Sequence, residues 1–398
     1  MKSLLSSLEV LEPRIAPATL TVTNLNDSGA GSLRALIAGS HNGDVIVFKA
    51  GLTGLIHVNS TLTIADSVTI NGGGKITLDG GGKVQLFKIT DGKSATTENV
   101  GLSGLTLRNG FASGTSASGG PTTSGGAIYT DETLTVTGCD FKTNLANYRG
   151  GAIYSDAGKL TISGSTFANN GINPGGYGGG AVFAIGQAMV VTSSSFSGNY
   201  DQSGGTAMEA YVTAGTFTMS GSSFTHNSTA DRGGSALSVE LIEGGTATVS
   251  TSTFTYNGGV GAVGGGLQIS SSDNGVINLA SDTISNNTAY TGGGAYLASA
   301  GVVTVTGCKM LNNSTSPSDG GGLYLDGASF TLKNTTVSGN SASPGGYGGG
   351  GGIYFYGGTL VLDHSTITGN SAAYAGGIYN SHGSIQNIAS IISGNTPA

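Results

Sequence analysis

A unit that repeats along most of the chain constrains the fold more than any other feature. Each copy ends in Phe-x-x-Asn, often with Ile, Val or Met in place of Phe, and successive copies lie 25 to 30 residues apart. A fixed period of this length indicates a solenoid in which each unit packs on its neighbours. The asparagines that end the units are Asn144, Asn170, Asn199, Asn227, Asn257, Asn287, Asn313, Asn340, Asn370 and Asn395.

Within each unit the apolar residues alternate with polar ones, as in TFTMSGSSF at 216–224 and TLVLDHSTI at 359–367. This period of two, rich in β-branched residues, predicts strands. One unit is too small to bury its own apolar face, so each strand pairs with its copy in the next unit, in the same direction. We therefore predict an all-β chain that forms a parallel β-helix (a solenoid) of roughly twelve coils. The preference for right-handed parallel crossovers predicts its hand.

Two motif positions have structural explanations. The glycine pair before Ile128, Ile153 and Ile353 predicts a tight corner with positive φ, where a side chain would clash. The asparagine that ends each unit tolerates left-handed φ in a turn, and its amide can bond to the asparagines of the coils above and below. Because ten copies suit a scaffold better than a single site, we interpret them as a structural ladder.

The chain divides into three segments. Residues 1–19 are predicted to be a leader or disordered segment, and residues 20–50 a cap with a short helix over 32–38. Asn26, Asp27 and Ser28 are candidate caps of that helix. Residues 51–398 are predicted to form the β-helix, with regular coils from about residue 120.

Particular motifs resemble known families. GGAIY at 125–129 and 150–154, with FKTN at 141–144 and FANN at 167–170, resembles the paired repeats of the polymorphic outer-membrane protein (Pmp) family over about 120–398. That resemblance implies a right-handed β-helix at a bacterial surface, often an adhesive one. The motif weakens in GGTAM at 204–208 and GGSAL at 233–237. LEPRIAP at 11–17 is similar to the LEPR-type leader of large secreted bacterial proteins, which implies export.

Composition excludes several classes of partner and cross-link. The net charge is −7 and no block of Lys or Arg occurs, so we expect no nucleic-acid partner. No run of 18 apolar residues occurs, so we expect no transmembrane helix. Cys139 and Cys308 lie six repeats apart, on the order of 29 Å at the spacing of paired strands, too far for a disulfide. We expect two free, inward or half-buried thiols that act as small apolar residues.

The sequence offers only a weak candidate for catalysis. Longer connections in three consecutive coils hold the acidic loop patch Glu209, Glu240, Glu243 and Asp273. We interpret the patch as a solvated acidic rim, with a weak ligand site and a catalytic site as the alternatives. No Asp-Asp pair exists and the histidines are scattered, so we expect no catalytic residues, no metal site and no cofactor.

An aromatic column is the better candidate for binding. It lies one residue after the apolar residue of each glycine-pair motif, where alternation would turn it outward. Exposed, it would bind sugars or protein surfaces; Met208 and Leu237, which we place in the same column, favour the alternative that it is buried. The tyrosines of the column are Tyr129, Tyr154, Tyr296, Tyr324, Tyr354 and Tyr379.

These features together predict a non-enzymatic, exported surface or matrix protein. It would act in adhesion or display through a repetitive face, with a glycan or a cell-surface protein as partner, outside the cell or at its surface. One alternative is a carbohydrate-active enzyme of the pectin-lyase-like superfold. Another is a structural module that associates end to end through its C-terminal coil.

Overall fold

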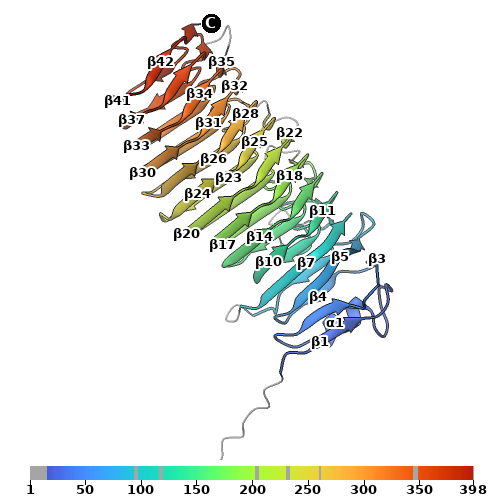
Figure 1. Cartoon of the computed structure of the whole chain (residues 1–398). Coiled ribbons are helices and arrows are strands. Elements are labelled where there is room, and N and C mark those ends of the chain that lie inside the picture. The colour runs from blue at the N-terminus through green and yellow to red at the C-terminus, as the bar shows by residue number, and fades with distance from the viewer. Residues whose placement is uncertain are drawn as a thin grey trace, which may run out of the picture.

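The computed structural model describes residues 16–93, 97–115, 120–201, 206–229, 234–259, 261–343 and 348–397. These residues form a rod of stacked β-coils, with the single helix α1 (Leu33–Ala38) near one end and the C-terminal strands at the other (Figure 1). The solenoid has about 13 turns, and every strand pairing in it is parallel. The predicted all-β parallel β-helix of roughly twelve coils is confirmed.

A regular coil contains four strands. In one coil these are β9 (Ile128–Thr130), β10 (Thr133–Thr137), β11 (Asp140–Lys142) and β12 (Leu145–Ala146). They pair in the next coil with β13 (Ile153–Asp156), β14 (Lys159–Ser163), β15 (Thr166–Ala168) and β16 (Gly171–Ile172). We refer to these four positions as the first to fourth strand columns.

Equivalent strands fill the columns along the rod. The first column also contains β4 (Leu62–Ile64), β6 (Phe87–Ile89), β23 (Leu237–Ile242), β26 (Leu267–Ser271), β36 (Ile353–Tyr356) and β40 (Ile378–Asn380). The second contains β1 (Thr19–Val22), β2 (Val45–Phe48), β24 (Thr246–Ser250), β27 (Val276–Ala280), β37 (Thr359–Asp363) and β41 (Ser384–Ile388). The third contains β3 (Gly54–His57), β18 (Ser195–Ser197), β21 (Ser223–Thr225), β25 (Thr253–Thr255), β28 (Thr283–Ser285), β31 (Lys309–Leu311), β34 (Thr336–Ser338), β38 (Thr366–Thr368) and β42 (Ile391–Ser393).

Some long strands run through a corner and serve two columns. The second and third columns share β5 (Thr69–Asp79) and β7 (Asn99–Arg108), and the first and second share β17 (Val182–Thr192), β20 (Met208–Ser220), β30 (Ala295–Thr306) and β33 (Leu323–Lys333). The fourth column consists of two separate short sheets. One contains β8 (Phe111–Ala112), β12, β16, β19 (Tyr200–Asp201) and β22 (Ser228–Thr229), and the other contains β29 (Thr288–Ala289), β32 (Ser314–Thr315), β35 (Ser341–Ala342), β39 (Ser371–Ala372) and β43 (Thr396–Pro397).

The N-terminal segment closes one end of the rod. Ser32 caps α1, because its hydroxyl accepts the N–H of Ala35 at 3.2 Å. The expectation that Asn26, Asp27 or Ser28 caps the helix is therefore wrong; Asp27 instead forms an ion pair with Arg34 at 2.7 Å. The parallel pairing already begins with β1 on β2, inside the predicted cap. The predicted leader lies largely outside the described residues.

The interior of the rod is a continuous apolar column in which identical residues stack. Phe141, Phe167, Phe196, Phe224 and Phe254 are fully buried in consecutive coils. The centroids of neighbouring rings lie 4.4 to 5.2 Å apart, and the rings are within 14° of parallel. The parallel register places the same side chain at the same level of each coil, so burial and ring stacking stabilise the rod together.

The asparagine that ends each unit forms a buried ladder beside these rings. The Asn227 side-chain oxygen accepts both the backbone N–H and the side-chain N–H of Asn199, each at 3.0 Å. The Asn227 side-chain nitrogen donates to the carbonyl of Phe196 and to the side-chain oxygen of Asn257, both at 3.0 Å. The pattern recurs from Asn144 to Asn395. Each amide is thus fully hydrogen-bonded inside the core, which removes the cost of burying it.

We predict that Asn227→Ala destabilises the rod by at least about 3 kcal/mol, because it leaves several buried donors and acceptors without partners at roughly 1–3 kcal/mol each. Urea unfolding followed by circular dichroism measures the effect. The control is Asn278→Ala, which alters a half-buried asparagine outside the ladder. Equal losses in the two variants would contradict a special role for the ladder.

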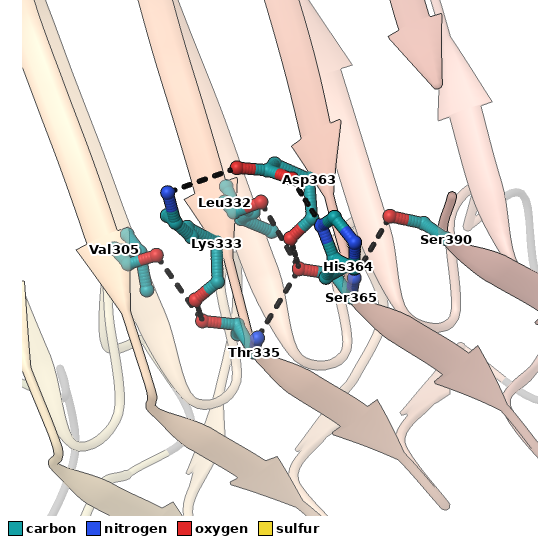
Figure 2. A network of polar contacts seen from close by, with 8 residues as sticks. All are labelled: Val305, Leu332, Lys333, Thr335, Asp363, His364, Ser365 and Ser390. Carbon is teal, nitrogen blue, oxygen red and sulfur yellow. Dashed lines mark hydrogen bonds and ion pairs between the residues drawn. The ribbon is translucent and has the colours of Figure 1, made fainter. Parts of the chain in front are cut away.

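A second ladder runs along another corner, five residues before each ladder asparagine. In Figure 2, the backbone N–H of Thr335 donates to the Ser365 hydroxyl at 3.1 Å, and the N–H of Ser365 donates to the Ser390 hydroxyl at 2.8 Å. The Ser365 hydroxyl donates in turn to the carbonyl of Leu332 at 3.0 Å. The same position holds Cys139, Ser165, Ser194, Ser222, Ser252, Asp282, Cys308, Thr335, Ser365 and Ser390.

This second ladder changes the interpretation of the cysteines. Both thiols are free and buried, as expected. They are nevertheless polar members of the ladder rather than apolar fillers, because the Cys308 sulfur accepts the N–H of Asp282 at 3.4 Å and donates to the Thr306 carbonyl at 3.5 Å. Burial raises the pKa of Cys139 to about 11 and that of Cys308 to about 12, so both stay protonated and unreactive near neutral pH.

Asp282 is the ionisable member of the second ladder. It is 1% exposed. Its carboxyl accepts the N–H of Ser252 at 2.8 Å and that of Ala280 at 3.1 Å, but burial outweighs both bonds and raises its pKa to about 6 from an ordinary 3.8. Folding therefore favours the protonated acid, and stability falls as the pH rises from about 4 to about 6.

We predict that Asp282→Ser, which restores the commonest residue of the ladder, is more stable than the wild type at pH 7.5 by about 3 kcal/mol, the cost of ionising a carboxyl with such a shift. At pH 4 most of this advantage should disappear, because the folded acid is then protonated and the unfolded carboxyl, with its ordinary pKa of 3.8, is only partly ionised. Urea unfolding at both values of pH measures the difference. Parallel pH profiles for the two proteins would contradict the prediction.

Candidate functional site

The strand register redefines the aromatic column. Tyr154 pairs with Phe183, which pairs with Glu209 and then Ser238. Placing Met208 and Leu237 in this column is therefore wrong: both face the core in line with Val182. From Tyr129 onward the column is Tyr129, Tyr154, Phe183, Glu209, Ser238, Gln268, Tyr296, Tyr324, Tyr354 and Tyr379.

A shift in the motif explains this difference. At the corner before the first column, Thr206 and Ser235 occupy the position that glycine holds in other coils, as Gly126, Gly151 and Gly180. The hydrogen bond from the Gly180 N–H to the carbonyl of Thr206 shows that these positions lie next to each other in successive coils. The glycine position is crowded: a Cβ on Gly126 would lie 2.3 Å from the carbonyl oxygen of Leu145. Within the described residues the hydroxyls of Thr206 and Ser235 are buried without hydrogen-bond partners.

The tyrosines of the column stack on one another rather than stand free. The centroid distances are 5.1 Å for Tyr296–Tyr324, 4.7 Å for Tyr324–Tyr354 and 5.2 Å for Tyr354–Tyr379. The shorter run Tyr129–Tyr154 is stacked in the same way at 5.3 Å. Most of these rings are half-buried, and burial raises the pKa of Tyr129 to about 12. Because each ring covers the face of its neighbour, the column presents mainly edges and hydroxyls to solvent.

The acidic loop patch does not converge on one point. Glu209 lies under the 174–180 loop and hydrogen-bonds to the hydroxyl of Tyr211 at 2.8 Å; burial raises its pKa, and the nearby Arg149 opposes that rise. Glu240 is exposed and lies beside Tyr211 in the next coil. The exposed Glu243 and Asp273 lie beyond β23 and β26, at the far end of the first column.

Arg149 covers this part of the first column. Its guanidinium carbon lies 4.5 Å from the ring centroid of Phe183 and 5.0 Å from that of Tyr148. This packing buries the stem of Arg149 and places a cation near Glu209, so the cluster stabilises the packing of the coils. Among the described residues, no group of three or more His, Cys, Asp or Glu side chains is arranged to hold a metal ion.

A groove at the corner between the third and fourth columns is a better candidate site. It has a volume of about 480 Å³, and we call it the corner groove. Its apolar floor comes from Phe111, Leu145 and Tyr200, which point outward from β8, β12 and β19 in one register line. Gly171 lies in the same line between Leu145 and Tyr200. The Tyr200 ring lies over it, since a Cβ there would be 2.3 Å from the ring.

Polar groups line one side of the corner groove. Asp79 receives hydrogen bonds from Arg108 at 2.8 Å, from the side chain of Asn109 at 3.1 Å and from the Gly81 N–H at 2.8 Å. Burial disfavours the Asp79 carboxylate, but these three donors outweigh it and lower its pKa. The exposed His57 and Asn169 complete the rim. The arrangement suits a neutral, hydroxyl-rich ligand with an apolar face.

The corner groove extends toward the N-terminal coils. A hollow of about 260 Å³ shares His57, Asp79 and Gly81 with it, and another of about 570 Å³ shares Phe111. The extension brings in Lys83 and Lys88, neither of which forms an ion pair with another described residue. The groove is thus open along the rod rather than closed around a small molecule.

Sequence reasoning missed the corner groove although a signal exists. The residue after each ladder asparagine faces outward, and in most coils it is Gly, Ser or Thr. Leu145 and Tyr200 are large apolar residues at this position. Phe111 is equivalent to them, because it follows Gly110, which takes the ladder position in its coil and donates its N–H to the Asn144 side chain at 2.9 Å. The site becomes visible only when the coils are aligned at this position.

The fold defines the class of protein: a right-handed parallel β-helix whose side wall carries a groove. In agreement, a family model described as a right handed beta helix region matches residues 264–396. No curated protein and no solved structure matches the chain. The described residues include no helix that is both long and apolar enough to cross a membrane.

We predict that the tyrosine column supports the fold. Tyr324→Phe should leave the free energy of unfolding nearly unchanged because both neighbouring rings keep their contact, whereas Tyr324→Ala should lower it by about 2 kcal/mol by removing a half-buried ring. Thermal unfolding measures both. An alanine variant as stable as the wild type would show that the stack contributes nothing to the fold.

Proposed function

We propose that this protein is a non-enzymatic adhesive β-helix, displayed at a cell surface or in an extracellular matrix, that binds an extended glycan in the corner groove. The observation that supports the proposal is the apolar line of Phe111, Leu145 and Tyr200 beside the polar rim of the groove. A sugar ring has one face of C–H groups and an edge of hydroxyls. The apolar line suits the face, and Asn109, Asn169 and His57 suit the edge.

The chemistry of the groove favours binding over cleavage. Glycoside hydrolysis of the usual kind needs two carboxyl groups on opposite sides of the scissile bond, about 5 to 9.5 Å apart. Among the described residues that line the corner groove, Asp79 is the single carboxylate. Hydrogen bonds from the Gly81 N–H, the Asn109 side chain and Arg108 outweigh its burial and favour the ionised form, which cannot donate a proton to a leaving group. The enzyme alternative therefore has less support at this site.

Rigidity supports a role in display. Two hydrogen-bonded ladders and a stacked core fix each coil on the next, so the groove keeps its shape without a ligand. A site that is already formed loses little entropy on binding. Exported adhesion is thus consistent with the architecture, and location outside the cell remains part of the proposal.

End-to-end association remains a prediction. Apolar residues of the last coil are exposed, among them Ile388 at 49% and Ile391 at 59%. Analytical ultracentrifugation over a wide range of concentration tests it, and a monomer at every concentration would count against it.

We predict that Phe111→Ala and Tyr200→Ala each weaken glycan binding at least tenfold, which corresponds to about 1.4 kcal/mol, because each removes part of the apolar floor. The measurement is titration calorimetry with a panel of soluble linear glucans, mannans, chitin oligosaccharides and polygalacturonate. Tyr374→Ala, which removes a 53% exposed ring far from the groove, is the matched control.

The same panel separates the proposal from its alternative. Release of shorter products by the wild type, lost in Asp79→Asn or Glu240→Gln, would favour the enzyme. Failure of every glycan to bind would overturn the proposed function.

A further inference from the structure

A hollow at the start of the fourth column continues the corner groove past Phe111. β8 is the edge strand of its sheet, so no earlier strand of the fourth column lies beside it. The turn 80–84 takes that place, and the Phe111 N–H donates to the Val84 carbonyl at 2.9 Å. The hollow has a volume of about 570 Å³, and Phe111 lines both it and the corner groove. We call it the lysine hollow.

Two lysines give the lysine hollow its charge. Lys83 is exposed in the turn 80–84. Lys88 is half-buried in β6, where it lies between Thr63 and Tyr129 of the neighbouring coils. Within the part of the chain that the structure describes, neither lysine forms an ion pair, and no Asp or Glu lines the hollow. The hollow is therefore a basic site on a chain whose net charge is −7.

The acids around the lysine hollow are bound to other groups. Asp27 approaches the rim, since the Asn59 side chain donates to it at 3.4 Å, but its ion pair is with Arg34 at 2.7 Å. Asp131 accepts the hydroxyl of Thr90 at 2.9 Å. Neither carboxylate is among the described residues that line the hollow. The two lysines therefore present positive charge to a ligand.

The wall of the lysine hollow is held in place by hydrogen bonds. Gln85 is 7% exposed, and its side-chain nitrogen donates to the carbonyls of Ser124 and Gly125 at 2.9 and 2.8 Å. Its side-chain oxygen accepts no hydrogen bond from a described residue and can accept one from a ligand hydroxyl. The Thr61 carbonyl accepts the guanidinium of Arg34 at 3.0 Å. A fixed wall with a buried acceptor beside two cations suits a ligand that has both hydroxyls and negative charge.

We propose that the glycan bound by this protein is acidic, and that the sugar unit beyond Phe111 places a carboxylate or a sulfate ester against Lys83 and Lys88. This inference rests on the proposed function of the corner groove. The corner groove itself is balanced in charge, because Asp79 pairs with Arg108, so an uncharged part of the glycan lies there. The acidic group lies in the lysine hollow, where the charges are complementary.

The test compares acidic and neutral forms of one glycan. Each neutral backbone of the panel is titrated in three forms, which are the unmodified oligomer, the oligomer oxidised to the uronate and its sulfate ester. At low salt the wild type should bind one acidic form of a backbone at least tenfold more tightly than the unmodified form. Added salt should reduce this preference, since it screens the lysines. The uronate and sulfate arms identify the acidic group.

Three variants locate the preference. Lys83→Gln/Lys88→Gln should lose it and bind the unmodified form as the wild type does. Lys83→Arg/Lys88→Arg should keep it, because the charge is retained. Lys309→Gln, which alters an exposed lysine in the third column, is the matched control and should also keep it.

Two results would overturn the lysine hollow. One is equal affinity of the wild type for all three forms of the backbone that it binds. The other is a preference that Lys309→Gln reduces as much as the double glutamine variant does. Both results leave the corner groove intact as long as Phe111→Ala weakens binding. Binding that does not depend on Phe111, or no binding of any form, would overturn the groove and the hollow together.

Discussion

The fold depends on the vertical match between equivalent groups in successive coils. The Asn227 amide illustrates this: its oxygen accepts two N–H groups of the coil before, and its nitrogen donates to a carbonyl of the coil before and to the oxygen of the coil after. Such a buried polar group is tolerated only when every donor and acceptor is paired. That requirement fixes the register of each coil, and the register in turn fixes which side chains form the core, the tyrosine column and the corner groove.

Register also explains how much of the fold could be predicted from the sequence. The period of the asparagines and the alternation around Phe224 and Phe254 were enough to predict a parallel solenoid, since only stacked coils bury such a pattern. The middle coils were misread because Ala207 and Met208 are adjacent apolar residues, and either could face inward. The backbone of the corner decides between them, as Thr206 takes the place of a glycine there.

The functional features were harder to predict for a related reason. The second ladder uses Ser, Thr, Asp and Cys at one position, so its members share hydrogen-bonding chemistry but not a residue type. The corner groove arises from residues of different coils, such as Asp79 and Tyr200, that are far apart in the sequence. Burial of Glu209 beneath a glycine-rich loop likewise reverses the sequence expectation of a solvated acid. The second ladder, the corner groove and the burial of Glu209 all depend on which residues lie next to each other in successive coils. The repeat motif reveals these neighbours only after the coils are aligned residue by residue.

The polarity of the asparagine ladder has a consequence for how such a molecule can evolve. Every rung from Asn144 to Asn370 presents the same acceptor to the coil before it and the same donor to the coil after it. A whole coil can thus be duplicated or lost without leaving an orphaned amide, while an insertion inside a strand breaks the chain of bonds. Length is therefore free to vary between descendants of such a gene, but the cross-section is not.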